Sequence, residues 1–212
     1  MAVVFITGPV SSGKSAFGVR LARESGCAVT YVATAAGAPE NVEWRARLVR
    51  HVRDRPASWR TVETAAMSHE AQLALFREAP AGTCLVVDAL GTWLEERIAN
   101  RIDLLEIDYT VLESQLDDEA ADFVDAMLAS RAYVIAVSEQ IGWDVVPVAA
   151  SARLFRDAMG RMAQRLARHD WTGLSRHQPV GLQFQDPGQF SRCTSNRAIP
   201  HALPGGWKAC CT

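Results

Sequence analysis

The sequence predicts an α/β fold with a mostly parallel β-sheet that is covered by helices on both faces. Two observations predict this class. Short, wholly apolar runs such as Val3–Thr7 are typical of strands buried on both faces. Between these runs lie longer segments, such as Asp108–Ser130, whose apolar residues recur at helical spacing. Strands that alternate with helices favour parallel pairing through right-handed crossovers.

The expected elements follow one another with clear end signals. Gly26 is expected to end the first helix, because glycine tolerates the left-handed conformation that closes many helices. A later helix should end before Pro56, since proline cannot continue it. In chain order we expect a strand at Val3–Thr7, a helix at Ser15–Glu24, a strand at Cys27–Ala33, helices at Glu40–Asp54 and Ser68–Glu78, a strand at Cys84–Val87, a helix at Asp108–Ser130, a strand at Tyr133–Val137 and a helix at Ser151–Arg168.

The regular pattern ends after the last of these helices. His169–Thr212 contains four Pro and no run comparable with Val3–Thr7, and Val180–Phe184 is its best strand candidate. We therefore expect a folded domain over residues 1–168. The tail over 169–212 is expected to be poorly ordered for the most part and to contribute no catalytic residue.

Composition and charge exclude several classes of protein. The 212 residues suffice for one domain with a sizeable core, and 49% hydrophobic with 22% charged residues is ordinary for a soluble domain. A net charge of −2 argues against nucleic-acid or polybasic membrane binding, and no apolar run has transmembrane length. The opening MAVVFITG resembles a strand more than a signal peptide. Five Cys without C-x-x-C spacing favour a reduced, cytoplasmic protein.

A phosphate-binding loop follows the first expected strand. Residues 8–15 match G-x-x-x-x-G-K-S/T at every fixed position, with a strand before and a helix after. Lys14 should act as a catalytic residue at the terminal phosphates, and the Ser15 hydroxyl should bind Mg²⁺. Lys14 is one of two Lys against twenty Arg, which supports a specific role over a chance lysine in a glycine-rich turn. The predicted nucleotide-binding residues of the loop are Gly8, Pro9, Val10, Ser11, Ser12, Gly13, Lys14 and Ser15. The motif specifies a P-loop NTPase with ATP or GTP as its ligand, and we expect the RecA-like form of that fold.

A second metal ligand is predicted at Asp88. It follows the apolar Leu85-Val86-Val87, where P-loop proteins place an acid directed at Mg²⁺. Ser15 and Asp88 would then bind the same ion. The alternative is that Asp88 caps the helix that follows it.

His51 lies in a basic segment. Trp44–Arg55 contains five Arg, and Arg47 shares a helix face with His51 because the two are four residues apart. A neutral imidazole at this place can attack a phosphorus atom while arginines hold the developing charge. Composition alone nevertheless favours a solvated basic helix with an ordinary surface histidine. The acidic cluster from Asp117 to Asp125 is likewise interpreted as a solvated helix face.

Further short motifs occur in a fixed order along residues 3–168. They are Tyr31-Val32-Ala33-Thr34, Arg47-Leu48, His51, Arg55-Pro56, Trp59-Arg60-Thr61, Glu63, Val87-Asp88, Trp93-Leu94, Val145-Val146-Pro147, Phe155-Arg156-Asp157, Gly160-Arg161 and Gln164-Arg165-Leu166-Ala167. With the P-loop, this combination resembles the bifunctional adenosylcobinamide kinase / adenosylcobinamide-phosphate guanylyltransferase family of cobalamin biosynthesis.

The resemblance implies two reactions on a corrinoid substrate. Adenosylcobinamide would be phosphorylated with ATP or GTP. His51 would then become guanylylated by GTP and pass GMP to adenosylcobinamide phosphate, giving adenosylcobinamide-GDP. The resemblance also implies nucleotide contacts from six positions: Thr34, Arg53, Asp54, Arg55, Glu63 and Asp88. The oligomeric state stays open, and a homo-oligomer is one possibility.

Several positions depart from the family pattern. The family's Asn-Glu step is altered in Ser138–Gly142, its Asp-Cys-Leu-Thr becomes Asp88-Ala89-Leu90-Gly91, and the Asn of Gly-Arg-x-Asn-Gln becomes Ala163. Two alternatives therefore remain: another P-loop small-molecule kinase or NTPase, and a decayed homologue that only binds nucleotide. An altered reading frame near residues 168–175 would explain the atypical tail.

Overall fold

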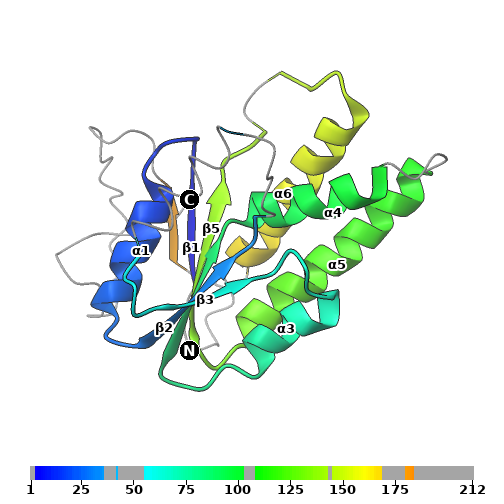
Figure 1. Ribbon diagram of the computed structural model, residues 1–212. Helices are drawn as coiled ribbons and strands as arrows, with labels where there is room; N and C mark the ends of the chain where they lie inside the picture. Colours follow the sequence, from blue (N-terminus) through cyan, green and yellow to red (C-terminus); the bar gives the residue numbers. More distant parts are fainter. Residues whose placement is uncertain are drawn as a thin grey trace.

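A six-stranded sheet forms the centre of the computed structural model, which describes residues 3–35, 42, 55–102, 108–142, 145–168 and 180–183 (Figure 1). The strand order is β3-β2-β4-β5-β1-β6, and all neighbouring strands are parallel. The strands are β1 (Val3–Gly8), β2 (Ala28–Ala33), β3 (Arg60–Glu63), β4 (Thr83–Asp88), β5 (Tyr133–Glu139) and β6 (Val180–Gln183). The predicted parallel sheet is confirmed.

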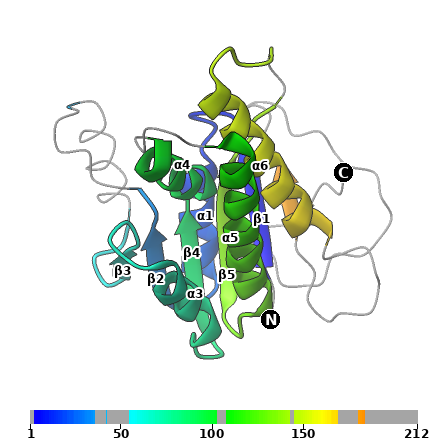
Figure 2. The same cartoon turned by 90° about the vertical axis from the view of Figure 1, so that its right-hand side faces the viewer.

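Helices cover both faces of this sheet, as Figures 1 and 2 show. Helix α1 lies on one face, and α3, α4, α5 and α6 lie on the other. Their bounds are Lys14–Glu24 for α1, His69–Arg77 for α3, Leu90–Ile102 for α4, Tyr109–Ala129 for α5 and Ala150–Arg168 for α6. None of the described helices is both long and apolar enough to cross a membrane.

The central strands β1, β4 and β5 are mainly apolar because successive side chains enter opposite cores. In β1, Phe5 packs into the core beneath α3–α6, whereas Ile6 packs into the core beneath α1. In β5, Val134 packs into the core beneath α3–α6 and Ile135 packs into the core beneath α1. A side chain of this size stabilises the fold by about 1.5–3 kcal/mol when fully buried. Burial on both faces thus explains the continuous apolar runs.

Two elements were not expected from the sequence. Strand β3 is polar and largely exposed, and it pairs only with β2 among the described strands, so it has none of the apolar character of a central strand. Helix α4 begins at Leu90, directly after β4, where we predicted no separate helix. The other described elements agree with expectation to within two residues at each end. The helix expected over Glu40–Asp54 lies outside the described residues, apart from position 42.

The tail contributes one strand to the sheet. Strand β6 pairs with β1 from Val4↔Val180 to Thr7↔Gln183. This strand lies within Val180–Phe184, the segment named above as the best strand candidate of the tail. Its pairing uses backbone groups along β1, so even four residues with little side-chain pattern can join the sheet. The rest of 169–212 lies outside the described residues, so its predicted disorder stays a prediction.

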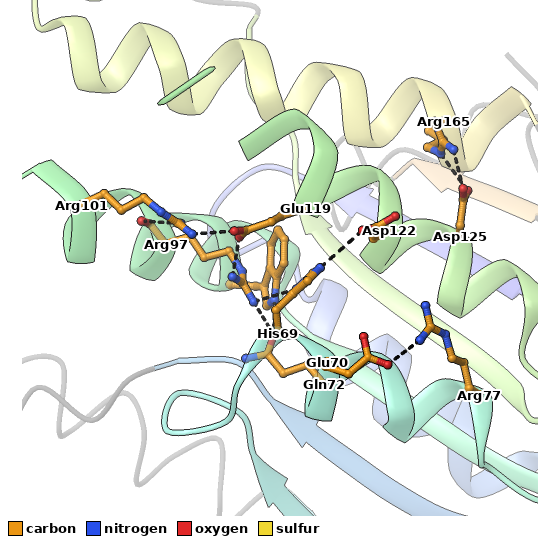
Figure 3. A network of polar contacts seen from close by, with 11 residues as sticks. His69, Glu70, Gln72, Arg77, Arg97, Arg101, Glu119, Asp122, Asp125 and Arg165 are labelled. Atoms are coloured by element: carbon orange, nitrogen blue, oxygen red, sulfur yellow. Dashed lines mark hydrogen bonds and ion pairs between the residues drawn. The ribbon is translucent and has the colours of Figure 1, made fainter. Parts of the chain in front are cut away.

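A polar network joins α3, α4 and α5 (Figure 3). Arg97 donates to Glu119 at 2.6 Å and to Gln72 at 2.7 Å, and its guanidinium lies 4.3 Å from the centroid of the Trp93 ring. Arg101 donates to the second carboxylate oxygen of Glu119, also at 2.6 Å. The Arg97 and Glu119 side chains are only 13% and 23% exposed. The prediction of a solvated acidic face is therefore wrong for Glu119, because α4 packs arginines against it.

Candidate nucleotide-binding site

The predicted P-loop connects β1 to α1 at the carboxyl edge of the sheet. Gly13 precedes α1 with φ of 86° and ψ of 8°, and Ser11 also has a positive φ of 61°. A Cβ at Gly13 would meet no atom within 4 Å, so the left-handed backbone, and not a lack of space, requires glycine there. Left-handed turns of this kind point successive N–H groups toward one point, as an anion site needs. The start of α1 adds its positive dipole end.

Lys14 is enclosed by the loop that it follows. It is the first residue of α1 and only 8% exposed. Its Nζ lies 3.4 Å from the carbonyl oxygen of Pro9, a long and weak hydrogen bond. A buried ammonium normally requires stronger partners than this. The oxygens of a bound phosphate would be such partners, because a loop of this kind binds phosphate.

The structure brings Ser15 and Asp88 together across 73 residues of sequence. The Ser15 hydroxyl donates to Oδ1 of Asp88 at 3.0 Å, although β5 separates β1 from β4 in the sheet. A hydroxyl and a carboxylate are hard oxygen ligands of the kind that Mg²⁺ prefers. Among the described residues no group of three or more His, Cys, Asp or Glu forms a metal cluster. The pair therefore fits an ion held partly by protein and partly by phosphate and water.

Tyr31 is a site residue that the sequence reasoning missed. Its hydroxyl donates a short hydrogen bond to Oδ2 of Asp88, so both oxygens of that carboxylate have donors. Burial raises the pKa of Tyr31, which keeps the phenol protonated and able to donate. The Arg55 guanidinium lies 3.6 Å from the centroid of the Tyr31 ring. Arg55, a predicted nucleotide ligand, thus lies close to Asp88.

The remaining predicted nucleotide-binding residues differ in where they lie, and some of them are outside the described residues. Thr34 is fully buried, and its hydroxyl donates to the Ala89 carbonyl oxygen at 2.6 Å and lies 2.7 Å from Oγ1 of Thr92. Its described contacts therefore tie the end of β2 to the start of α4. Glu63 ends β3 on an exposed edge. His51, Arg53 and Asp54 lie outside the described residues.

Glu139 is the second site residue that the sequence reasoning missed. It ends β5 and pairs in register with Gly8, the first residue of the P-loop. Its Oε2 accepts from the Gly91 backbone N–H at 3.0 Å. Burial raises the pKa of Glu139, the Lys14 charge opposes this rise, and the Asp88 charge adds to it. The signal was present in the sequence, because an acid at the end of an apolar strand is the same pattern that selected Asp88.

A family model described as cobinamide kinase / cobinamide phosphate guanyltransferase matches residues 4–172. The chain belongs to this family. The bifunctional adenosylcobalamin biosynthesis protein CobP of Pseudomonas aeruginosa is 37% identical over 163 residues, which cover 76% of this chain and 85% of that protein. The corresponding protein CobU of Salmonella typhimurium is 32% identical over 167 residues, covering 78% and 90%. The resemblance inferred from the motifs is confirmed.

A solved structure supports the fold class. It comes from a study of a prototypical ATPase of the type III secretion system of pathogenic bacteria and has a TM-score of 0.50 at 12% identity. The match covers 85% of this chain and spans about half, 51%, of the ATPase. At this identity the likeness concerns the fold alone, and it agrees with the predicted P-loop NTPase class.

Proposed function

We propose that this chain is a bifunctional transferase of cobalamin biosynthesis. In the first reaction it moves the terminal phosphoryl group of ATP or GTP to the aminopropanol hydroxyl of adenosylcobinamide. In the second it moves GMP from GTP to adenosylcobinamide phosphate, giving adenosylcobinamide-GDP. Membership of the cobinamide kinase / cobinamide phosphate guanyltransferase family and the names of two relatives support both reactions.

The observation that carries the proposal is the Ser15–Asp88 hydrogen bond of 3.0 Å beside the enclosed Lys14. In the first reaction, the backbone of residues 8–15 would hold the phosphates and Lys14 would neutralise charge on the transferred group. Ser15 and Asp88 would hold Mg²⁺, which when bound lowers the negative charge of the phosphates. Positioning and charge stabilisation supply most of the catalysis in phosphoryl transfer.

In the second reaction His51 acts as the nucleophile. An imidazole nitrogen attacks the α-phosphorus of GTP, the bond to pyrophosphate breaks, and a guanylyl-histidine forms. An oxygen of adenosylcobinamide phosphate then displaces the histidine. Arg53, Asp54 and Arg55 follow His51 in the chain, and with Thr34 and Glu63 they complete the proposed nucleotide contacts. The position of Arg55 over Tyr31, which bonds Asp88, supports one shared nucleotide site.

The proposed substrates are small molecules. The net charge of −2 favours neither nucleic acid nor an anionic membrane as a partner, and a cytoplasmic location fits a chain that uses soluble nucleotides. The proposal is compatible with a homo-oligomer.

Labelled nucleotides test the two reactions separately. Incubation with α-labelled GTP should leave acid-labile, base-stable label on the protein, and His51→Ala should abolish it while GTP still binds, because the P-loop binds phosphates independently. Label from γ-labelled ATP or GTP should appear on adenosylcobinamide. Covalent label that persists in the His51→Ala variant would contradict the assignment of His51. A wild-type protein that binds GTP but transfers no label would be a nucleotide-binding homologue without catalysis.

A further inference from the structure

Strand β5 brings an additional carboxylate to the proposed phosphate site. It lies between β1, which leads into the P-loop, and β4, which ends in Asp88. In register, Glu139 pairs with Gly8 on one side, and Val137, two residues earlier, pairs with Asp88 on the other. Glu139 therefore ends its strand between the loop that would hold the terminal phosphates and the acid that would hold the metal.

The Glu139 side chain is oriented by the first turn of α4. Its Oε2 accepts from the Gly91 N–H at 3.0 Å. An added Cβ at Gly91 would overlap Oε2 and would lie 2.9 Å from Cδ of Glu139. The approach is thus possible because residue 91 has no side chain.

The two carboxylates of the site differ in the groups that donate hydrogen bonds to them. Both oxygens of Asp88 accept hydrogen bonds from side-chain hydroxyls, those of Ser15 and Tyr31. The Glu139 carboxylate accepts from backbone N–H groups, those of Gly91 and of Glu139 itself, and no side chain in the described part of the protein donates to it. Burial raises the pKa of Glu139, and the positive charge of Lys14 opposes this rise. A carboxylate that is held in one orientation and binds a proton more readily than usual is suited to act as a general base.

We propose that Glu139 is the catalytic base of the phosphoryl-transfer reaction, which rests on the kinase half of the proposed function. As the substrate hydroxyl oxygen forms its bond to the terminal phosphorus of the nucleotide, the hydroxyl proton passes to the carboxylate of Glu139. The bond between that phosphorus and the bridging oxygen breaks, and the nucleoside diphosphate leaves with the electron pair. The products are the phosphate monoester and the diphosphate, and the proton later passes from Glu139 to water.

Glu139→Gln removes the base but keeps the shape of the side chain. With adenosylcobinamide and γ-labelled GTP, we expect kcat to fall about 100-fold or more, the usual contribution of a positioned base. The Kd for GTP should stay the same or decrease, since one negative charge beside the phosphates is lost. The control is Glu70→Gln, the same change at a side chain that is 76% exposed and paired with Arg77, which should keep the wild-type kcat.

Gly91→Ala moves the carboxylate without removing it. Only the flexible end of Glu139 has to shift, because the next contact of the new Cβ is Cζ of Phe155 at 3.5 Å, an ordinary distance. The fold should tolerate this change, and kcat should fall. In a Glu139→Ala background the same Gly91→Ala change should have no further effect on kcat, because the overlapping atoms are gone. This dependence of one substitution on the other is not expected of two independent structural defects.

The outcomes distinguish a catalytic role of Glu139 from a structural role and from a protein without kinase activity. Wild-type kcat in both Glu139→Gln and Gly91→Ala, while the wild type transfers label, would overturn the base and leave the proposed function intact. Weaker GTP binding together with a lower melting temperature in Glu139→Gln would show that Glu139 serves to cap α4. That result would also overturn its role as the catalytic base. A wild-type protein that binds GTP but transfers no terminal phosphate would refute the kinase reaction and this inference with it.

Discussion

The proposed nucleotide site at the carboxyl edge of the sheet, here called the nucleotide edge (Lys14, Ser15, Asp88 and Glu139), and the α3–α4–α5 network are both partly buried polar clusters. Their groups are hydrogen-bonded within the protein to different degrees. In the network, both oxygens of Glu119 accept from arginines, and Gln72 bonds through its carbonyl oxygen to Trp93 and Arg97 and through its amide nitrogen to the backbone of Thr64 (Figure 3). At the nucleotide edge, among the described residues, Lys14 makes one long contact to Pro9 and Glu139 accepts only from backbone N–H groups.

This difference separates a structural cluster from a binding site. A buried ion pair is tolerated when each charge has its partners within the protein, as in the network. A site that is pre-organised for phosphate keeps charges and donors whose best partners are on the ligand. Breaking the first cluster should therefore lower the free energy of unfolding, whereas breaking the second should lower ligand affinity or rate.

The largest effect is expected for Lys14→Ala at the nucleotide edge. Loss of the cation that faces the phosphates should weaken GTP binding by about 2–5 kcal/mol, with little change in stability. Isothermal titration with GTP and a urea unfolding curve measure the two quantities. A folded variant that binds GTP as tightly as the wild type would show that the P-loop is not the nucleotide site.

In the network, Arg97→Ala should have the opposite effect, a loss of stability with no change in GTP affinity. It leaves Glu119 short of a partner and removes the guanidinium from the face of Trp93, so the free energy of unfolding should fall by about 2–3 kcal/mol, below the full cost for a completely buried pair. GTP affinity of the folded protein should not change. Urea denaturation checks this, with Glu70→Gln as the exposed-pair control, expected to change stability by less than about 1 kcal/mol. A loss of GTP affinity without a loss of stability would refute the structural role.

A smaller effect is expected for Tyr31→Phe, which removes the hydroxyl that donates to Asp88 and that also bonds Arg55, while it keeps the ring. Hydrogen bonds to charged groups contribute about 1.5–3 kcal/mol, and water can replace part of that here, so Mg²⁺-dependent GTP affinity should fall by about 1–2 kcal/mol. The affinity without Mg²⁺ should change less, because Asp88 would act through the metal. Titrations with Mg²⁺ and with EDTA compare the two, and equal losses in both would count against Asp88 as a metal ligand.

The smallest effect concerns His69 in the network. Burial and the positive charge of Arg97 lower the pKa of His69 below its ordinary value of 6.5. Below pH 6.5 the unfolded chain therefore takes up this proton more readily than the folded protein does, and the free energy of unfolding falls as the pH falls. Urea curves at pH 7.5 and 5.5 should show a smaller decrease for His69→Gln than for the wild type. An identical pH dependence in the two proteins would contradict this account.

Much of the fold followed from the sequence because central strands and long helices have strong local patterns. Val3–Ile6 is apolar at every position and leads into a phosphate-loop motif, so the place of this strand was clear. Strand β3 could not be predicted in this way, since it is exposed at the sheet edge and is held by backbone pairing with β2. The β6 segment was recognised only as the best strand candidate of the tail, because its pairing depends on the edge of β1 and not on a strong side-chain pattern.

The sequence by itself determined the P-loop, its lysine and the acid at Asp88, because each depends on residue type at a fixed spacing or at a strand end. Only the tertiary structure decided that Tyr31 bonds Asp88 and that Glu139 reaches Gly91. These pairs are 57 and 48 residues apart, and strand order and register place them together. No local pattern encodes them, since the pairing of distant strands depends on how the whole sheet packs.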